Sequence, residues 1–416
     1  METILPQLQS AKTASRVIAR LLNSERSQLV LDIADALEKN AEQILTANRL
    51  DAENMEDDNP KKDRLLLTLD RITAIANDAR NVSKLPDPTG IIQLERKLEN
   101  GIELQKMSVP LGVVGVIYES RPNVTVDVAV LAIKSGNAIV LRGGSDADNS
   151  NRAIVSLIHN VLRAHSFPTE IVQLLPTDRA LVKELLEAEK YVDIIIPRGS
   201  AGLIQFVRDN SKIPTIETGA GVCHTFVENS ANLFKAVGIV ANAKIQRPSV
   251  CNSLDTIIVQ EGICDSFLSK IVQNFSAHNV EIFADERAFS ILQKENYPYL
   301  QQATDEDFGR EFLSLKCSIK VVASFDEALA HISKYSSKHS EAIVSEDKAL
   351  CERFLQEVDA AAVYTNASTR FTDGGVFGLG AEIGISTQKL HARGPFALEK
   401  LVTEKWILRG DGQVRE

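Results

Sequence analysis

Apolar residues in the first 88 positions recur at helical spacing. Five of them follow one another at intervals of three or four residues: Val30, Ile33, Leu37, Ala41 and Ile44. That spacing predicts one buried helical stripe. The charged segment MEDDNPKKD at 55–63 predicts a turn, and KLPDPTG at 84–90 ends the helical region with two prolines and a glycine.

The pattern then changes to two alternating runs on either side of Asn100-Gly101, within IIQLERKLENGIELQKMSV at 91–109. Asn-Gly between alternating runs is the strongest short-range signal for a β-hairpin. A lone hairpin is only marginally stable, so we expect this one to pack against another element, such as a second subunit. The stretch WILRGDG at 406–412 predicts a short terminal strand that could pair with the hairpin.

From residue 111 the apolar runs become short, β-branched and nearly continuous. Four runs have this character: LGVVGVIY, AIVLRG, IVQLLP and VDIIIP. Helical patterns separate or follow them at 122–134, 147–164, 178–188 and 200–210. Strands buried on both faces and alternating with helices form parallel sheets. The pattern therefore predicts an α/β domain of the dinucleotide-binding type.

The segment PTIETGAGVCHTFVE at 214–228 leads into a second α/β unit. Its candidate strands are LDTIIVQ, VEIFA, SIKVVA, EAIVS and AAVYTNA. Three parts are expected. Residues 1–90 and 107–222 would form the cofactor-binding domain and residues 223–385 the catalytic domain. Residues 91–106 and 399–416 would form an oligomerisation hairpin and terminal strand.

Composition narrows the class of protein. Lys and Arg number 46 against 56 Asp and Glu, so the formal net charge is −10 and nucleic acid is not an expected partner. No run approaches 18 apolar residues, and METILPQLQSAKTAS lacks the apolar core of a signal peptide. The five cysteines contain no CxxC pair. Reduced thiols in a soluble cytoplasmic protein are expected, rather than disulfides or a metal site.

Cys251 occupies a polar break, QRPSVCNSLD, between a helical run at 231–246 and a buried strand. A thiol at such a junction can meet backbone N–H dipoles and attack a carbonyl as the thiolate. The alternative is an exposed or packing thiol without a chemical role. Cys223 is the only rival nucleophile. The remaining thiols lie on an amphipathic helix, at a strand start and on a helical face: Cys264, Cys317 and Cys351.

Asn123 and Glu217 are candidates for the chemistry of a thiol enzyme. Asn123, in SRPNV, begins a helix after a strand. Its amide could stabilise an oxyanion, or it could be an ordinary N-cap. Glu217, in IETGAG, lies at a strand end beside glycines. It could transfer a proton or be a solvated turn acid.

Two glycine-containing strand ends are candidates for binding a cofactor. LRGGSDA at 141–147 supplies Arg142, Gly143, Gly144 and Ser145, and PRGSAG at 197–202 supplies Arg198, Gly199 and Ser200. A strand end that opens a helix suits phosphate. Tight turns explain these glycines about equally well, and neither stretch is the G-x-G-x-x-G fingerprint.

In order and spacing, these stretches resemble the aldehyde dehydrogenase superfamily. The similarity extends to VPLGVVGVIYESRPNVTVDVAVLAIKSGNAIVLRGG, ETGAGVCH, QRPSVCNSLD and HARGPFALEKLVTEKW, which are typical of its acyl phosphate-reducing branch. The resemblance implies reduction of L-glutamate 5-phosphate by NADPH to L-glutamate 5-semialdehyde and phosphate, in proline biosynthesis. It implies a thioester on Cys251, facing the nicotinamide, with Asn123 as an oxyanion donor.

Two departures from the wider superfamily affect these expectations. Hydrolytic members use a glutamate to activate water, which an acyl phosphate reductase does not need, so the role of Glu217 is open. NAD-preferring relatives carry an acid where this chain has Ser145, and the missing carboxylate favours NADP. The rival hypotheses are an aldehyde-oxidising dehydrogenase of the same fold and an inactive scaffold.

In the superfamily, the loop after the last catalytic-domain strand closes over the substrate. Here it is NASTRFTDGGVFGLG at 366–380. Ser368, Thr369 and Arg370 are candidate donors to the substrate and Asp373 is a candidate acceptor. Alternatively, Arg370 forms a surface or intersubunit salt bridge. A homo-oligomer and a functional link to glutamate 5-kinase complete the expectations.

Overall fold

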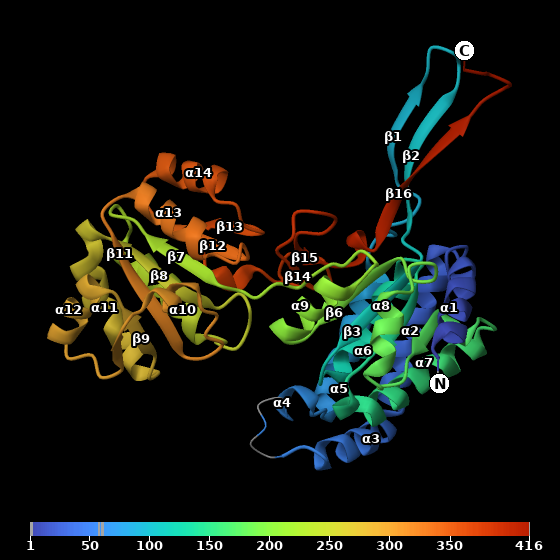
Figure 1. Cartoon of the computed structure of the whole chain (residues 1–416), viewed down its shortest axis with the longest axis horizontal. Coiled ribbons are helices and arrows are strands. Elements are labelled where there is room, and N and C mark those ends of the chain that lie inside the picture. The colour runs from blue at the N-terminus through green and yellow to red at the C-terminus, as the bar shows by residue number, and fades with distance from the viewer. Residues whose placement is uncertain (1–2, 57–58, 60–61, 416) are drawn as a thin grey trace. The chain divides into compact units, whose positions relative to one another are not determined.

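The computed structural model describes residues 3–56, 59 and 62–415 (Figure 1). Contacts between Cα atoms divide the chain into two compact units. Unit 1 comprises Met1–Thr218, Gly378–Gly384 and Phe396–Glu416, and unit 2 comprises Gly219–Phe377 and Ile385–Pro395. The predicted division of labour, with cofactor binding in one part and catalysis in another, stays a prediction.

Unit 1 begins with helices, as the apolar spacing predicts. They are α1 (Leu5–Ile18), α2 (Asn23–Lys39), α3 (Ala41–Glu53), α4 (Lys62–Leu65) and α5 (Leu69–Lys84). All five residues of the predicted stripe are buried, but the expectation of a single helix is wrong. The chain leaves helical geometry at Asn40, with φ −113° and ψ 25°, so the stripe is divided between α2 and α3.

A four-stranded parallel sheet forms the centre of unit 1, and it confirms the α/β prediction. Its strands are β3 (Val113–Tyr118), β4 (Ala138–Arg142), β5 (Val172–Leu174) and β6 (Ile194–Arg198), in the order β5-β4-β3-β6. The helices are α6 (Pro122–Lys134), α7 (Asp148–Ala164), α8 (Ala180–Leu186) and α9 (Ala201–Asn210). The direction of winding reverses between β3 and β6, which is where open α/β sheets bind ligands.

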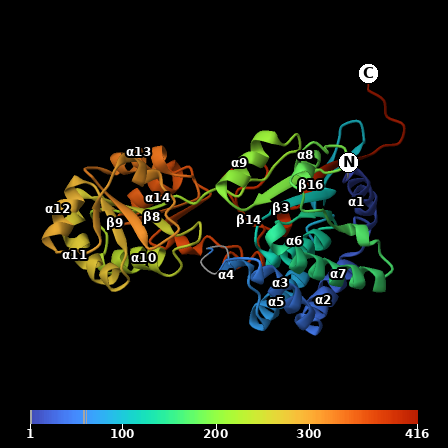
Figure 2. The same ribbon diagram turned by 60° about the horizontal axis from the view of Figure 1, so that its bottom comes forward.

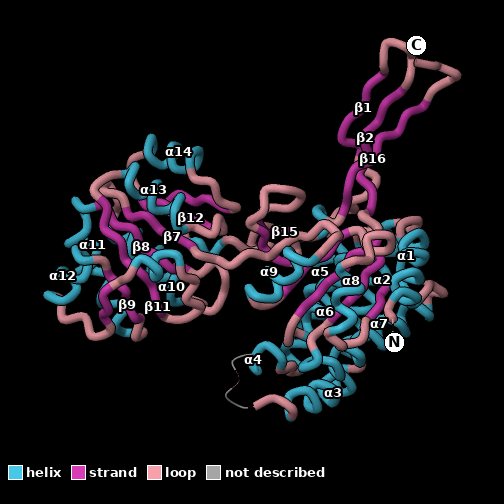
Figure 3. The backbone as a smooth tube through the Cα atoms, in the orientation of Figure 1, coloured by secondary structure: helices cyan, strands magenta, loops and turns pink. Residues whose placement is uncertain are grey.

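Unit 1 also carries a three-stranded antiparallel sheet, seen at the top of Figure 1 and in magenta in Figure 3. It joins β1 (Ile92–Lys97), β2 (Glu103–Pro110) and β16 (Val402–Arg409) in the order β1-β2-β16. Gly101 in the turn has φ +87°, a conformation that favours glycine. The predicted pairing of hairpin and terminal strand is confirmed, although β16 starts four residues earlier than expected.

Unit 2 contains a seven-stranded parallel sheet covered by helices (Figure 2). The strand order is β10-β9-β11-β8-β7-β12-β13, and every pairing is parallel. The strands are β7 (Cys223–Val227), β8 (Leu254–Gln260), β9 (Glu281–Ala284), β10 (Leu300–Gln302), β11 (Lys316–Val322), β12 (Ser340–Val344) and β13 (Ala362–Thr365). The helices are α10 (Leu233–Ile245), α11 (Glu261–Ala277), α12 (Glu286–Lys294), α13 (Phe325–Tyr335) and α14 (Lys348–Glu357).

The five strands predicted for unit 2 are confirmed, and two others were not predicted. One is β10, at an edge of the sheet. The other is β7, which lies near the middle of the sheet and reads CHTFV. Its polar residue His224 is fully buried because Nδ1 bonds to the equally buried carboxylate of Glu341 at 3.0 Å. Because the partner of His224 is distant in the chain, the local sequence of β7 does not show the apolar pattern that would predict a buried strand.

Short elements complete the chain. They are β14 (Gly384–Ser386), β15 (Gly394–Phe396) and 3₁₀ turns at Ser145–Ala147, Thr169–Ile171, Asp305–Gly309, Thr369–Phe371 and Leu398–Lys400. Within the described ranges, no helix combines the length and apolar character that crossing a bilayer requires.

Candidate functional site

The predicted cofactor-binding stretches lie at the carboxyl edge of the unit 1 sheet. Arg142 ends β4, Arg198 ends β6, and Gly199 and Ser200 connect β6 to α9. Asn123 is the second residue of α6, just after β3. Because the carboxyl ends of parallel strands meet at one edge, the fold brings these loops together at the β3/β6 reversal.

Two polar residues that the sequence analysis did not select join these loops. Glu119 follows β3, and its carboxylate accepts the backbone N–H of Ser200 at 3.1 Å and the Ser200 hydroxyl at 3.2 Å. The next residue, Ser120, has φ +33° and donates its hydroxyl to Asp146, beyond β4. The loops after β3, β4 and β6 are therefore held together by side-chain hydrogen bonds.

Asn123 is half-buried and donates its side-chain N–H to Asp127 Oδ2 at 3.0 Å. The alternative that Asn123 is an N-cap is wrong. The N-cap of α6 is Arg121, and no side chain caps that end. Burial raises the pKa of Asp127 to about 7, against the opposing effect of the Asn123 bond. Asn123 therefore sits in a polar pair at the switch point.

The helix N-termini at this edge already carry carboxylates of the chain itself. Asp51 of α3 accepts the backbone N–H groups of Asn149 at 3.1 Å and Ser150 at 2.8 Å, in the first turn of α7. At α9, Ser200 is the N-cap and accepts the N–H of Leu203. The first N–H groups of α7 are thus engaged, and a phosphate at this edge would depend on loop and side-chain donors.

In both glycine-containing stretches, neighbouring side chains lie too close to the backbone to leave room for a Cβ atom. A Cβ on Gly143 would lie 2.3 Å from Asn151 Nδ2, and one on Gly199 would lie 2.9 Å from the Glu119 carboxylate. Gly143 therefore has a packing role, and Gly199 keeps the backbone close to the switch point.

The cations at the same edge fit an anionic dinucleotide. Arg142 donates from Nη2 to the Thr177 carbonyl at 2.8 Å, while its buried Nε has no partner among the described residues. Burial lowers the pKa of Arg142, and the guanidinium of Arg179 adds to that effect. Two guanidiniums and a buried, unused donor beside β4 form a donor set suited to phosphate.

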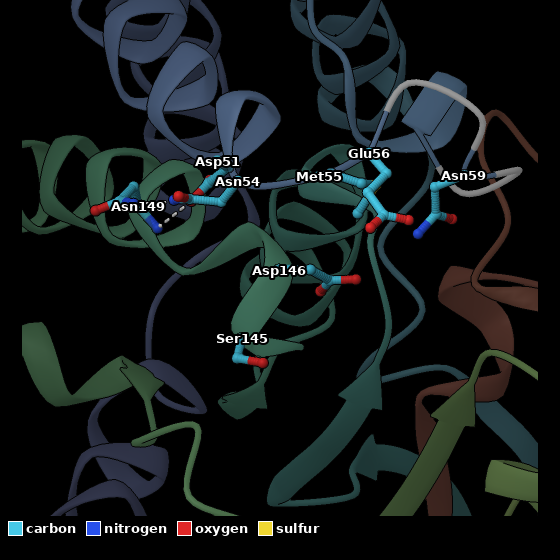
Figure 4. Close-up of a pocket in the computed structure, with 8 residues that line it drawn as sticks. All are labelled: Asp51, Asn54, Met55, Glu56, Asn59, Ser145, Asp146 and Asn149. Atoms are coloured by element: carbon cyan, nitrogen blue, oxygen red, sulfur yellow. Dashed lines mark hydrogen bonds between the residues drawn. The ribbon is translucent and has the colours of Figure 1, made fainter.

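A cavity of about 450 Å³ adjoins Ser145, between the end of α3 and the start of α7 (Figure 4). Its lining comprises Asp51, Asn54, Met55, Glu56, Asn59, Ser145, Asp146 and Asn149. Three carboxylates make this cavity unsuitable for the phosphates of a dinucleotide. Among the predicted cofactor residues, Ser145 alone is part of the described lining.

Glu217 lies at the end of unit 1. Its Oε2 is 3.6 Å from Nη1 of Arg208 on α9, and the Glu217 side chain is largely shielded. The ion pair and the low exposure of the side chain do not match the alternative of a solvated turn acid.

Cys251 lies at the amino-terminal edge of the unit 2 sheet, in the loop that precedes β8. The five cysteines are thiols, and Cys251 alone among them is partly exposed. Burial raises the pKa of Cys264 and of Cys317 to about 12, and it also raises the pKa of Cys223 and of Cys351 above the ordinary value. The four buried thiols therefore stay protonated near neutral pH, which leaves Cys251 as the candidate nucleophile.

The segment that leads into β7 contacts the backbone carbonyl of Cys251. Cys223 Sγ donates to the Cys251 carbonyl at 3.3 Å. Gly221 approaches so closely that a Cβ on it would lie 1.6 Å from the same carbonyl oxygen. Both residues precede or begin β7, so the strand that the sequence analysis missed positions the candidate nucleophile.

The predicted substrate loop is bonded to the Cys251 loop. Asn252 Nδ2 donates to the Thr372 carbonyl at 2.8 Å, and Thr369 Oγ1 donates to the Asn252 carbonyl at 2.7 Å. The hydroxyl of Ser368 accepts the N–H of Arg370. Ser368 and Thr369 are buried, and their hydroxyls bond to the backbone of Arg370 and of Asn252, respectively, so Arg370 is the best placed of the three to meet a ligand.

A second guanidinium, which the sequence analysis did not select, accompanies Arg370. Arg370 donates from Nε to Gln246 Oε1 at 3.2 Å, and Arg247 is the next residue along the chain. Burial lowers the pKa of Arg370, and the positive charge of Arg247 lowers it further, while Cys251 and Asp373 act in the opposite sense. Two cations beside a thiol suit a substrate with negative charges.

Taken with the fold, this thiol site defines the class of protein. The aldehyde dehydrogenase family matches residues 2–291, more than half of the chain. The chain belongs to the aldehyde dehydrogenase family, and the resemblance seen in the sequence is confirmed. Members of this family that act as reductases use a nicotinamide dinucleotide, which fits the cationic, glycine-containing edge of unit 1.

Similar proteins identify the branch of the family. A protein of Chlorobium phaeovibrioides named gamma-glutamyl phosphate reductase is 53% identical over 416 residues, covering 100% of this chain and 98% of the relative. One from Bacteroides fragilis with the same name is 52% identical, with 98% of each chain covered. The chain thus groups with the gamma-glutamyl phosphate reductases.

Solved structures agree with this placement. The crystal structure of gamma-glutamyl phosphate reductase from Thermotoga maritima matches with a TM-score of 0.95 and 44% identity, covering 100% of both chains. An acetylating aldehyde dehydrogenase from Geobacillus thermoglucosidasius gives a TM-score of 0.71 at 18% identity. The second likeness concerns the fold alone, and together they confirm the predicted fold class.

Proposed function

We propose that this chain reduces L-glutamate 5-phosphate to L-glutamate 5-semialdehyde and phosphate with NADPH, in proline biosynthesis. The observation that carries the proposal is full-length identity above 50% with gamma-glutamyl phosphate reductases, combined with one partly exposed cysteine beside two guanidiniums. Activity in the cytoplasm and a functional link to glutamate 5-kinase belong to the same proposal.

Cys251 is the proposed nucleophile. Its thiolate attacks the carbonyl carbon of the acyl phosphate, so that a C–S bond forms and the carbonyl oxygen takes up the electron pair. The amide of Asn123 and the backbone N–H of Cys251 stabilise this oxyanion. The C–O bond to phosphate then breaks, phosphate leaves with the bonding pair, and a thioester remains on Cys251.

The reduced nicotinamide, when bound, supplies the hydride that reduces this thioester. Collapse of the resulting thiohemiacetal breaks the C–S bond and releases the aldehyde, and Cys251 returns to its thiolate. No step requires activated water, which is consistent with Glu217 being paired to Arg208.

We infer from the cations beside β4 that the chain prefers NADPH to NADH. The guanidinium of Arg179 lies close enough to Arg142 to lower its pKa, and two guanidiniums suit the 2′-phosphate of NADP. The other proposed cofactor residues are Gly143, Gly144, Ser145, Arg198, Gly199, Ser200 and Glu217. They would contribute backbone and side-chain donors at the carboxyl edge.

The substrate's α-carboxylate is assigned to Arg370, with Arg247 as the nearby second cation. Ser368 and Thr369 support this loop through their hydrogen bonds. A carboxylate accepts paired N–H donors from arginine more readily than from other side chains. These residues would therefore distinguish glutamate 5-phosphate from an uncharged aldehyde or acyl phosphate.

We further propose that the sheet β1-β2-β16 forms a subunit interface. Both outer strands are largely exposed, and four large apolar side chains on or beside them are about half exposed: Ile91, Ile92, Trp406 and Leu408. Exposed apolar groups on a sheet with two open edges favour association with another copy.

A coupled assay tests the proposed function. NADP reduction would be followed with L-glutamate 5-semialdehyde, with and without phosphate, for the wild type, Cys251→Ala and the buried-thiol control Cys351→Ala. We expect phosphate-dependent activity that Cys251→Ala abolishes and Cys351→Ala largely retains. Phosphate-independent oxidation would instead identify an aldehyde-oxidising dehydrogenase, and full activity of Cys251→Ala would refute the thioester mechanism.

A further inference from the structure

Asn123 and Asp127 form a pair on one face of α6. They are four residues apart, so their side chains lie one above the other on the helix surface, and Asn123 Nδ2 donates to Asp127 Oδ2 at 3.0 Å. Among the described residues, Asp127 is the one hydrogen-bond partner of the Asn123 side chain. One amide N–H is thus engaged, and a second N–H is left for a ligand.

We propose that Asp127 is a positioning residue for the oxyanion-binding amide. Its carboxylate accepts one N–H of Asn123 and thereby directs the second N–H, rather than the amide oxygen, toward the reacting carbonyl oxygen. This inference rests on the proposed function, in which Asn123 stabilises the oxyanion.

The physical basis is the near symmetry of an amide. Rotating the Asn123 amide by a half-turn exchanges NH₂ and oxygen with little change in shape. An ionised carboxylate can only accept hydrogen bonds, so it permits one orientation. A protonated carboxyl can also donate to the amide oxygen, which permits the opposite orientation and would place an oxygen against the developing negative charge.

Burial and the neighbouring charges cause Asp127 to gain or lose its proton near neutral pH. Burial raises the pKa of Asp127 to about 7, Asp78 on α5 raises it, and Arg198 at the end of β6 lowers it. Lys134, the other ionisable residue of α6, bonds to Asn23 and Ser27 at the far end of the helix.

The first test is the pH profile of kcat between pH 6 and 9 in the oxidative direction, at saturating semialdehyde, phosphate and NADP. For the wild type we expect kcat to fall as pH falls through about 7, because Asp127 becomes protonated. Asp127→Asn should lose this acidic limb, and Asp78→Asn should move it to lower pH by removing a negative charge. The exposed control Asp35→Asn should leave it unchanged.

Ionisation of the Cys251 thiol also affects kcat, so its profile is measured separately by the rate of alkylation with iodoacetamide. We expect the alkylation profile to be the same in the wild type and in Asp127→Asn, while their kcat profiles differ. An acidic limb that is identical in both kcat profiles would overturn the proposal.

A double-mutant cycle separates this inference from the proposed function. Asp127→Ala should lower kcat by about 10-fold, less than the roughly 10²-fold expected when an oxyanion donor is lost. It should have no further effect in an Asn123→Ala background. If Asn123→Ala leaves kcat intact, the oxyanion role fails. If Asn123→Ala is defective but Asp127→Ala is not, or if their effects are additive, only the positioning role fails.

Stability provides a readout of opposite sign. The folded-state pKa of Asp127 is above its ordinary value of 3.8, so the stability of the fold decreases as pH rises through that window, while activity increases. At pH 8, Asp127→Asn should therefore unfold at the same or a higher temperature than the wild type, with lower kcat and an unchanged KM for NADP. A lower melting temperature together with a raised KM for NADP would assign Asp127 to structure and refute positioning.

Discussion

Replacing Gly221 with alanine tests how closely the Cys251 loop is held. A Cβ at Gly221 would lie 1.6 Å from the Cys251 carbonyl oxygen, 2.4 Å from its carbonyl carbon and 2.7 Å from its Cα. Side-chain Cβ atoms essentially never approach closer than 3.0 Å, so the loop must move by at least 3.0 − 1.6 = 1.4 Å. The obstacle is backbone, which cannot rotate away as a flexible side chain could.

This displacement predicts a large loss of activity. A shift of about 1 Å in a reacting group can cost roughly 10²-fold in rate, so we expect Gly221→Ala to lower kcat by about 10²-fold or more. Overpacking typically destabilises by about 1–3 kcal/mol, so the melting temperature should also fall. The KM for NADPH should stay unchanged, because the proposed cofactor residues belong to unit 1.

The assay compares kcat, the alkylation rate of Cys251 and thermal unfolding for Gly221→Ala and Gly238→Ala. Gly238 lies on α10 of the same unit, and a Cβ there would meet nothing within 4 Å. Its replacement should retain full activity and stabilise the helix by up to about 1 kcal/mol. If Gly221→Ala keeps more than half of the wild-type kcat with an unchanged melting temperature, the close approach of Gly221 does not position Cys251.

Three further variants test the proposed binding surfaces. Arg370→Ala should raise the KM for semialdehyde by about 10- to 100-fold, matching a lost charged hydrogen bond, with little change in the NADP constant; equal weakening of both ligands would assign Arg370 to structure. Arg179→Ala should raise the KM for NADPH about 10-fold and leave that for NADH unchanged, and steady-state kinetics with both cofactors would contradict this if the two constants moved together. Trp406→Glu should place a charge in the proposed interface and give smaller species by light scattering, and an unchanged mass would disprove that interface.

Much of the fold was determined by local sequence pattern. Continuous apolar runs such as those of β3 and β8 can be buried only with helices on both faces, so they predict parallel strands without knowledge of their partners. Asn100-Gly101 specifies a hairpin because few residue pairs adopt its turn geometry. The polar break around Cys251 likewise identified a junction between elements, where the structure places the one partly exposed thiol.

Other features depend on residues that are distant in the chain, so only the tertiary structure decided them. The strand β7 contains buried His224 because Glu341, 117 positions away, receives its hydrogen bond. Asp51 occupies the start of α7 from a helix nearly 100 positions earlier. No periodicity in the sequence reports such pairings, because each group is polar by itself and becomes a satisfied interior group only beside its partner.

The division is similar for the candidate site. The sequence selected Asn123 and Arg370 as residue types able to stabilise negative charge, and residue type is a local property. Asp127 accepts a hydrogen bond from the Asn123 amide, and the hydroxyls of Ser368 and Thr369 are engaged by the backbone of Arg370 and of Asn252; both observations follow from the folded structure. The sequence therefore predicted which residue types could take part in the chemistry. The orientation of each side chain, and whether it can still bond to a ligand, were determined by packing and hydrogen bonding in the folded chain.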